Sequence, residues 1–175
     1  MMRFLEPDDA RRARFGVWFF RRTLEYGVRY GAVYSDPDAR GAAVWLPPGQ
    51  TDMSFWRTAR SGFMTLPFRL GLQGMGRFNQ IDRTFGRWHK QLMKQKHWYL
   101  LTLGVAPASQ AHGIGSALIE QVARRADDTG LPCYLETTTP ENVVYYGRRG
   151  FEVVREGTVA GEFYGWAMLR RPATR

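Results

Sequence analysis

The sequence has little cysteine and little histidine: one and three residues, respectively, among 175. A single cysteine, Cys133, excludes an intrachain disulfide and leaves a cysteine-based zinc site without enough ligands. The histidines do not have the spacing of metal ligands, so we expect no bound metal. Because Cys133 lies in the strand-like run PCYLE, we interpret it as a small buried apolar residue rather than a nucleophile.

The sequence also lacks an uncharged apolar run of about 18 residues, so we expect no membrane span. Its first residues, MMRFLEPDDARRAR, contain acids and arginines where a signal peptide would have an apolar core. A cytoplasmic location is the expectation. With no repeat, low-complexity tract or linker, residues 1–175 are predicted to form one domain.

Acidic residues are the minority, since 25 lysines and arginines outnumber 16 aspartates and glutamates, for a net charge of +9. This excess could indicate an anionic partner such as nucleic acid, an acidic membrane surface or a phosphorylated cofactor. The alternative is a soluble surface that is simply rich in arginine. Because the cations extend from Arg3 to Arg175 rather than forming a tail, we do not expect nucleic-acid binding.

Residues 7–30 have the pattern of an amphipathic helix. Apolar residues recur at steps of three and four, which predicts one buried stripe made of Ala13, Val17, Phe20, Leu24 and Val28. Three aromatic residues widen this stripe: Phe15, Trp18 and Phe19. The opposite, solvated side is predicted to carry Arg11, Arg12, Arg14, Arg21 and Arg22.

A hairpin follows, with runs at 32–34 and 42–46 around a turn-rich segment. Residues 52–72 predict a helix that is interrupted near Pro67, and the glycine cluster at 71–78 predicts a connection to a helix that ends near residue 92. The remaining pattern is strand, helix, strand, helix, strand, strand, at 97–105, 113–129, 133–138, 142–149, 151–159 and 162–170. The near-continuous apolar run HWYLLTLGV predicts a strand buried on both faces. The fold class is therefore a mixed α/β domain around one sheet.

The stretch SQAHGIGSAL, residues 109–118, places two glycines between a strand and a helix. Helix N-termini carry unpaired N–H groups and partial positive charge, and glycine lets a ligand approach the backbone closely. This arrangement suits a pyrophosphate. By itself it does not distinguish a phosphate site from tight packing, because the third glycine of a dinucleotide loop and the Gly-Lys-Ser/Thr of a P-loop are absent.

Two neighbouring motifs narrow this choice. Residues 110–115 have the form Q-x-x-G-x-G, LTLGVAP precedes them, and NVVYYGRRGF follows, with Tyr146 four residues before Gly150. This order resembles the GNAT superfamily of acyl-CoA-dependent N-acetyltransferases over residues 97–171, and the hairpin fits more loosely. The resemblance implies a central mixed, mostly antiparallel sheet flanked by helices, but the usual first strand is missing from the pattern.

The resemblance implies acetyl-CoA as co-substrate. The pantetheine arm would pair with strand backbone around Gly104, where a β-bulge is predicted, the alternative being a glycine that ends the strand. Backbone N–H groups from Ala111 to Ser116 would hold the pyrophosphate, Gln110 would brace the loop, and His112 would be filler rather than a base. The predicted cofactor-binding residues are Leu103, Gly104, Val105, Gln110, Ala111, His112, Gly113, Ile114, Gly115, Ser116, Asn142 and Tyr146.

Tyr146 matches the acid that protonates the departing thiolate, although it or Tyr145 could simply cover the core. Glu136 is the candidate general base, the alternative being an outward-facing strand residue. The family often has an asparagine seven residues before the tyrosine, where this sequence has Thr139. Asn142 could contact the cofactor instead, or cap its helix.

The resemblance therefore implies transfer of an acetyl group from acetyl-CoA to an amine of a small molecule or peptide. The alternative is a catalytically weak acyl-CoA-binding sensor or partner module, and a homodimer is possible. Acceptor specificity would come from the first helix, residues 52–96 and the closing strands. The aromatic residues there predict either an apolar pocket or core packing: Phe55, Trp56, Phe63, Phe68, Phe78, Phe85 and Trp88.

Overall fold

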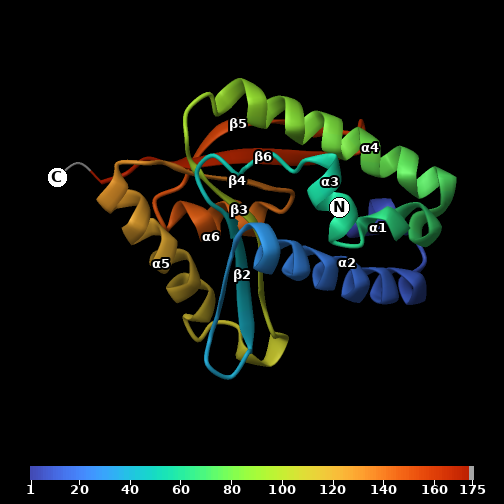
Figure 1. Cartoon of the computed structure of the whole chain (residues 1–175), viewed down its shortest axis with the longest axis horizontal. Coiled ribbons are helices and arrows are strands. Elements are labelled where there is room, and N and C mark those ends of the chain that lie inside the picture. The colour runs from blue at the N-terminus through green and yellow to red at the C-terminus, as the bar shows by residue number, and fades with distance from the viewer. Residues whose placement is uncertain (174–175) are drawn as a thin grey trace.

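A computed structural model describes residues 1–173 as a six-stranded mixed sheet in the order β1-β2-β3-β4-β6-β5 (Figure 1). Strands β3 and β4 are parallel, and every other neighbouring pair is antiparallel. The mixed, mostly antiparallel sheet is thus confirmed. The strands are β1 Ala32–Ser35, β2 Gly41–Leu46, β3 Trp98–Val105, β4 Cys133–Thr137, β5 Glu152–Val159 and β6 Phe163–Arg170.

Helices cover both faces of the sheet (Figure 1). One core packs the sheet against α1, α2 and α4, and the other packs it against α5 and α6. The helices are α1 Met2–Leu5, α2 Asp9–Tyr30, α3 Phe55–Arg60, α4 Leu66–Leu92, α5 Ile114–Thr129 and α6 Pro140–Gly147, with short 3₁₀ turns η1 Phe63–Thr65 and η2 Pro107–Ser109. Before β1 the described residues form α1 and α2 and no strand, as expected from the absence of the family's usual first strand in the sequence pattern. Within residues 1–173, every helix is too short or too polar to cross a bilayer.

Helix α2 forms where the sequence predicts, but it buries a different face. Val17, Phe20 and Val28 of the predicted stripe are exposed, whereas Phe15 and Trp18, which were predicted to widen the stripe, enter the core together with Tyr26. The centre of the predicted stripe was therefore wrong, whereas the burial of Phe15 and Trp18 at its side is confirmed. The rings of Phe15 and Trp18 remove more apolar surface from water than Val17 and Val28 would, which favours burial of the side of the helix that carries them.

The glycine cluster at 71–78 begins at a kink in α4 that joins two helical segments, so the predicted connection is only one residue long. One residue there leaves helical geometry: Gly71, with φ 65° and ψ −177°, kinks the helix. Pro67 stands in the first turn of α4 and begins it, because a proline there has no intrahelical hydrogen bond to lose. The predicted interruption near Pro67 is confirmed, because α3 ends at Arg60 and α4 begins at Leu66, directly before the proline.

Strand β3 is less buried than its apolar run predicts, and only Leu100 within it is buried. The pairing of β3 with β4 is confined to Trp98 with Cys133 and Tyr99 with Tyr134. Beyond these pairs, the described residues supply no strand partner for the β4-facing edge of β3. The later half of β3 thus presents backbone N–H and C=O groups for a ligand to pair with.

A β-bulge is present in β3, but not at Gly104. The register shifts between Val44 and Trp45 of β2, which face Thr102 and Leu100, so Leu101 is the extra residue. Gly104 pairs in regular register with Ala42. The predicted position was wrong because a classic bulge places its extra residue near the right-handed helical region, where glycine is not required.

Candidate active site

The loop before α5 has the backbone geometry of an anion site. Ala111 and Gly113 adopt positive φ angles of 64° and 80°, and Gly113 is the N-cap of α5, where no side chain caps the helix. The Ala117 N–H donates to the Gly113 carbonyl at 3.0 Å, so the N–H groups that precede Ala117 in the helix point out of its N-terminus. Such exposed N–H groups and the helix dipole favour a phosphate.

Gln110 holds this loop against the end of β3. Its side-chain Nε2 donates to the Val105 carbonyl at 3.1 Å. His112 turns back on the loop, with Nδ1 2.7 Å from the Gln110 carbonyl, and stays exposed. Gln110 therefore links the open strand to the anion site, whereas the His112 ring does not face the cavity described next.

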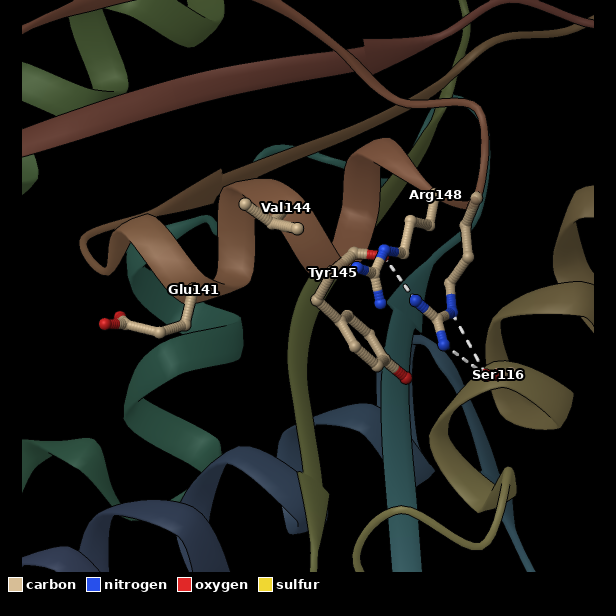
Figure 2. Close-up of a pocket in the computed structure, with 6 residues that line it drawn as sticks. Ser116, Glu141, Val144, Tyr145 and Arg148 are labelled. Carbon is tan, nitrogen blue, oxygen red and sulfur yellow. Dashed lines mark hydrogen bonds between the residues drawn. The ribbon is translucent and has the colours of Figure 1, made fainter.

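A cavity of about 510 Å³ lies between β3, the loop, α5 and α6. It brings together ten of the twelve predicted cofactor-binding residues, all except Gly104 and His112. Its full lining is Leu103, Val105, Ser109, Gln110, Ala111, Gly113, Ile114, Gly115, Ser116, Asn142, Tyr145, Tyr146 and Arg149. A second cavity of about 460 Å³ adjoins it, sharing Ser116, Tyr145 and Arg149 and adding Glu141, Val144 and Arg148 (Figure 2).

Arg149 is a residue of this site that the sequence analysis did not select. Its Nε donates to Ser116 Oγ at 3.1 Å, and its other guanidinium nitrogens bond Ser116 Oγ and the Tyr145 carbonyl (Figure 2). The guanidinium lies 3.4 Å from the centre of the Tyr145 ring. A full positive charge is thereby held beside the N-terminus of α5. The paired arginines in YYGRRGF were the available signal.

Tyr146 forms part of the cavity wall and is otherwise buried in the α5–α6 core. Burial raises the pKa of its hydroxyl to about 12, so the group keeps its proton at neutral pH and can donate it. Asn142 lies one turn earlier, and its Nδ2 donates to Thr137 Oγ1 at 3.1 Å. Because Thr139 is the N-cap of α6, the alternative that Asn142 caps the helix was wrong.

Glu136 lies outside the cavity lining, on the other face of the sheet. The Tyr99 hydroxyl donates to Glu136 Oε2 at 2.6 Å, while Oε1 is buried and has no hydrogen-bond partner among residues 1–173. Burial raises the pKa of this carboxyl to about 7, and burial also keeps the Tyr99 pKa well above its ordinary value, so Tyr99 stays a donor. The carboxylate is therefore not an outward-facing strand group.

A histidine pair extends this buried polar cluster. His89 of α4 stacks on Tyr134 of β4 at 4.8 Å between ring centres, and its Nε2 lies 2.7 Å from His97 Nε2. His97 Nδ1 lies 2.8 Å from the Gln95 carbonyl, to which it donates in the tautomer that lets Nε2 accept from His89. Burial lowers both pKa values, that of His89 to about 4. The pair is neutral, and the described residues contain no group of three or more histidine, cysteine, aspartate or glutamate side chains placed for a metal.

Tyr146 and Glu136 therefore lie on opposite faces of the sheet. Tyr146 packs with Leu135 on the α5–α6 side of the sheet. Glu136 is the next residue of β4 and points the other way, with Tyr134 on the α2–α4 side.

Comparisons with known proteins agree with this geometry. Residues 30–151 match the model of the acetyltransferase (GNAT) family. An uncharacterized N-acetyltransferase from Schizosaccharomyces pombe is 30% identical over 125 residues, which are 69% of this chain and 51% of that protein. The chain thus spans about half the length of this curated relative.

A solved structure extends the likeness to the whole fold. The crystal structure of histone acetyltransferase HPA2 and related acetyltransferase from Corynebacterium glutamicum aligns with 96% of this chain and 79% of its own, at a TM-score of 0.58 and 20% identity. At that identity the likeness concerns the fold alone. With the family match covering more than half of its residues, the chain belongs to the acetyltransferase (GNAT) family.

Proposed function

We propose that this protein is an N-acetyltransferase that moves the acetyl group of acetyl-CoA to an amine of a small molecule or peptide. One observation carries the proposal. The open edge of β3, the exposed N–H groups of α5 and the Tyr146 hydroxyl all border the same cavity. An extended arm, a pyrophosphate and a leaving thiolate each need one of these three features.

The cofactor would lie across this cavity in an extended conformation. Leu103 and Val105 would pair with the pantetheine amides, since the β4-facing edge of the later half of β3 is open. The N–H groups from Ala111 to Ser116 would bind the pyrophosphate, and Gly113 leaves open space where a Cβ would otherwise project. Arg149 would add a guanidinium that pairs with a phosphate oxygen.

The transfer is a direct displacement at the thioester carbonyl. The neutral amine attacks the carbonyl carbon, the C–N bond forms, and the C–S bond breaks. The Tyr146 hydroxyl supplies a proton to the departing sulfur, and Glu136 accepts the proton lost by the nitrogen through a water molecule. A carboxyl with a pKa of about 7 is suited to this task, because it is partly deprotonated at neutral pH and still basic enough to accept a proton.

Isothermal titration calorimetry with acetyl-CoA tests the first step, and we expect saturable binding. Absence of binding at millimolar acetyl-CoA would overturn the proposal. Turnover is then measured against a broad panel of amines by following free thiol release. Tight binding without turnover on any amine would favour the sensor module instead.

The aromatic segment does not point to one acceptor. Phe63 and Trp88 are core residues, whereas Phe55, Trp56 and Phe68 are exposed. Neither cavity described above has an aromatic lining residue from residues 52–96. The amine panel should therefore span polar, aromatic and peptide amines.

A further inference from the structure

Residues 53–81 carry positive charge and no negative charge. Between Asp52 and Asp82 the sequence contains four arginines and not one aspartate or glutamate. These residues form α3, η1 and the first half of α4, and they follow β2 as an excursion from the sheet. The four arginines are Arg57, Arg60, Arg69 and Arg77.

The same segment exposes large apolar side chains. The exposed fractions of the residues reach 75% for Trp56, 89% for Phe68 and 94% for Leu72, and Phe55 and Met64 are also more than half exposed. These five residues and the four arginines are called the apolar–basic patch below. Other residues of the segment, including Phe63, Leu66 and Leu70, pack in the core. The five exposed side chains are not part of that core.

The patch lies apart from the proposed cofactor cavity. Helix α4 packs on the face of the sheet opposite to α5. In Figure 1, α3 and the first part of α4 lie away from α5 and its N-terminal loop. The first turns of α4 end at the non-helical Gly71, where a Cβ would meet open space. Leu72, the next residue, is exposed. An occupant of the patch would leave the cavity uncovered.

The chemistry of the patch selects one kind of occupant. A second copy of the chain would bring arginines against arginines, which like-charge repulsion opposes. Nucleic acid would use the arginines and aromatic rings, but it offers no apolar phase for Met64 and Leu72. The interface of an anionic bilayer satisfies both parts, because Trp, Phe and Leu enter the headgroup boundary while arginines pair with lipid phosphates.

We propose that the apolar–basic patch docks this protein onto the surface of membranes that contain anionic phospholipids. Residues such as Trp56 and Phe68 would insert their rings at the headgroup level. The two exposed arginines, Arg60 and Arg69, would remain above them at the phosphates, since their stems are long enough to reach outward. Arg57 and Arg77 are half-buried and stack on Tyr30 and Phe4, so they would add charge beneath the surface. This association is peripheral and does not require a spanning helix.

Co-sedimentation of the full chain with vesicles tests the proposal. We expect binding to vesicles of equal parts phosphatidylglycerol and phosphatidylcholine, and at least tenfold weaker binding to pure phosphatidylcholine. The double variant Phe68→Ser/Leu72→Ser should bind anionic vesicles at least tenfold more weakly, because both residues lose their apolar contact. Arg60→Gln should weaken binding about fivefold, as expected for one cation near a charged surface.

The matched control is Val153→Ser, which removes an exposed apolar side chain from β5 on a different element and should bind like the wild type. Unchanged unfolding midpoints and circular dichroism establish that the variants fold. Equal binding to neutral and anionic vesicles, no binding to either, or wild-type binding by the double variant would each overturn the proposal. If the wild-type protein binds a single-stranded oligonucleotide but not anionic vesicles at the same salt concentration, the patch is a nucleic-acid site and the membrane proposal is wrong.

Discussion

Two adjacent tyrosines show how one residue step separates two roles. Tyr146 packs edge-on against Phe151 in the core, with 5.8 Å between ring centres. Tyr145 points to the loop instead, where its hydroxyl lies beside Gly115 and its ring contacts Arg149. Tyr146 combines a buried ring, a raised pKa and a position at the wall of the cavity.

The substitution Tyr146→Phe should therefore lower kcat about 100-fold, because the departing thiolate loses its proton donor. The Kd for acetyl-CoA should stay within twofold of wild type, since the ring and its packing remain. Steady-state kinetics on the accepted amine and calorimetry measure the two quantities. Tyr145→Phe is the matched control and should lose much less kcat, and a wild-type rate in Tyr146→Phe would remove Tyr146 as the acid.

At the scale of elements, strand β3, the loop and α5 form one unit. Gln110 joins the loop to β3, and Arg149 joins α6 to the first turn of α5 through Ser116. The unit is closely packed at Gly115, where an added Cβ would lie 2.4 Å from the Tyr145 hydroxyl. At Gly113 there is open space, and the constraint is the φ of 80°.

Bulk at Gly115 should consequently impair the site more than changes in the loop side chains. Gly115→Val should raise the Kd for acetyl-CoA at least tenfold by displacing Tyr145 and covering the N–H groups. Gly113→Ala should lower the free energy of unfolding by about 1–2 kcal/mol through left-handed strain. Calorimetry and urea unfolding measure these effects. His112→Ala serves as the control and should change neither quantity appreciably, whereas an equal loss in that variant would contradict the backbone model of binding.

At the scale of the whole molecule, the environment of Glu136 is assembled from three distant segments. Tyr99 comes from β3, Tyr134 from β4, and His89 from α4, which encloses the cluster. Burial is the main reason that the Glu136 pKa rises to about 7, and the charge of Asp82 also raises it. The hydrogen bond from Tyr99 opposes part of this rise.

The pH profile should report this carboxyl. The value of kcat/KM should increase as pH rises to about 7 and then level off, because the base acts only when deprotonated. Glu136→Gln should lower kcat about 100-fold and remove that limb. A wild-type profile in this variant would exclude Glu136 as the base.

The free energy of unfolding should also depend on the protonation of Glu136, but it should fall with rising pH where kcat/KM increases. The folded pKa of about 7 lies above the unfolded value of about 4.3, so the native state binds the proton more tightly. The contribution of Glu136 to the free energy of unfolding therefore falls as pH rises from about 4.5 to about 7. Urea unfolding across this range should show a fall in wild type that Glu136→Gln lacks.

The sequence by itself determined the features that depend on neighbouring residues. The Q-x-x-G-x-G glycines lie between a predicted strand and a predicted helix, and Tyr146 follows at a fixed distance. This pattern predicts the order of elements, the family and most of the cavity lining. This works because the N–H groups at a helix N-terminus are oriented by the local chain, whatever the distant contacts are.

Only the tertiary structure decided which α2 face is buried, where β3 bulges, that Arg149 joins the anion site, and that the Glu136 carboxyl is buried. Each depends on residues far apart in sequence, as the Glu136 carboxyl depends on Tyr99 and Asp82. Burial and pKa are properties of the packed surroundings, because desolvation is set by the atoms that exclude water and not by the local chain.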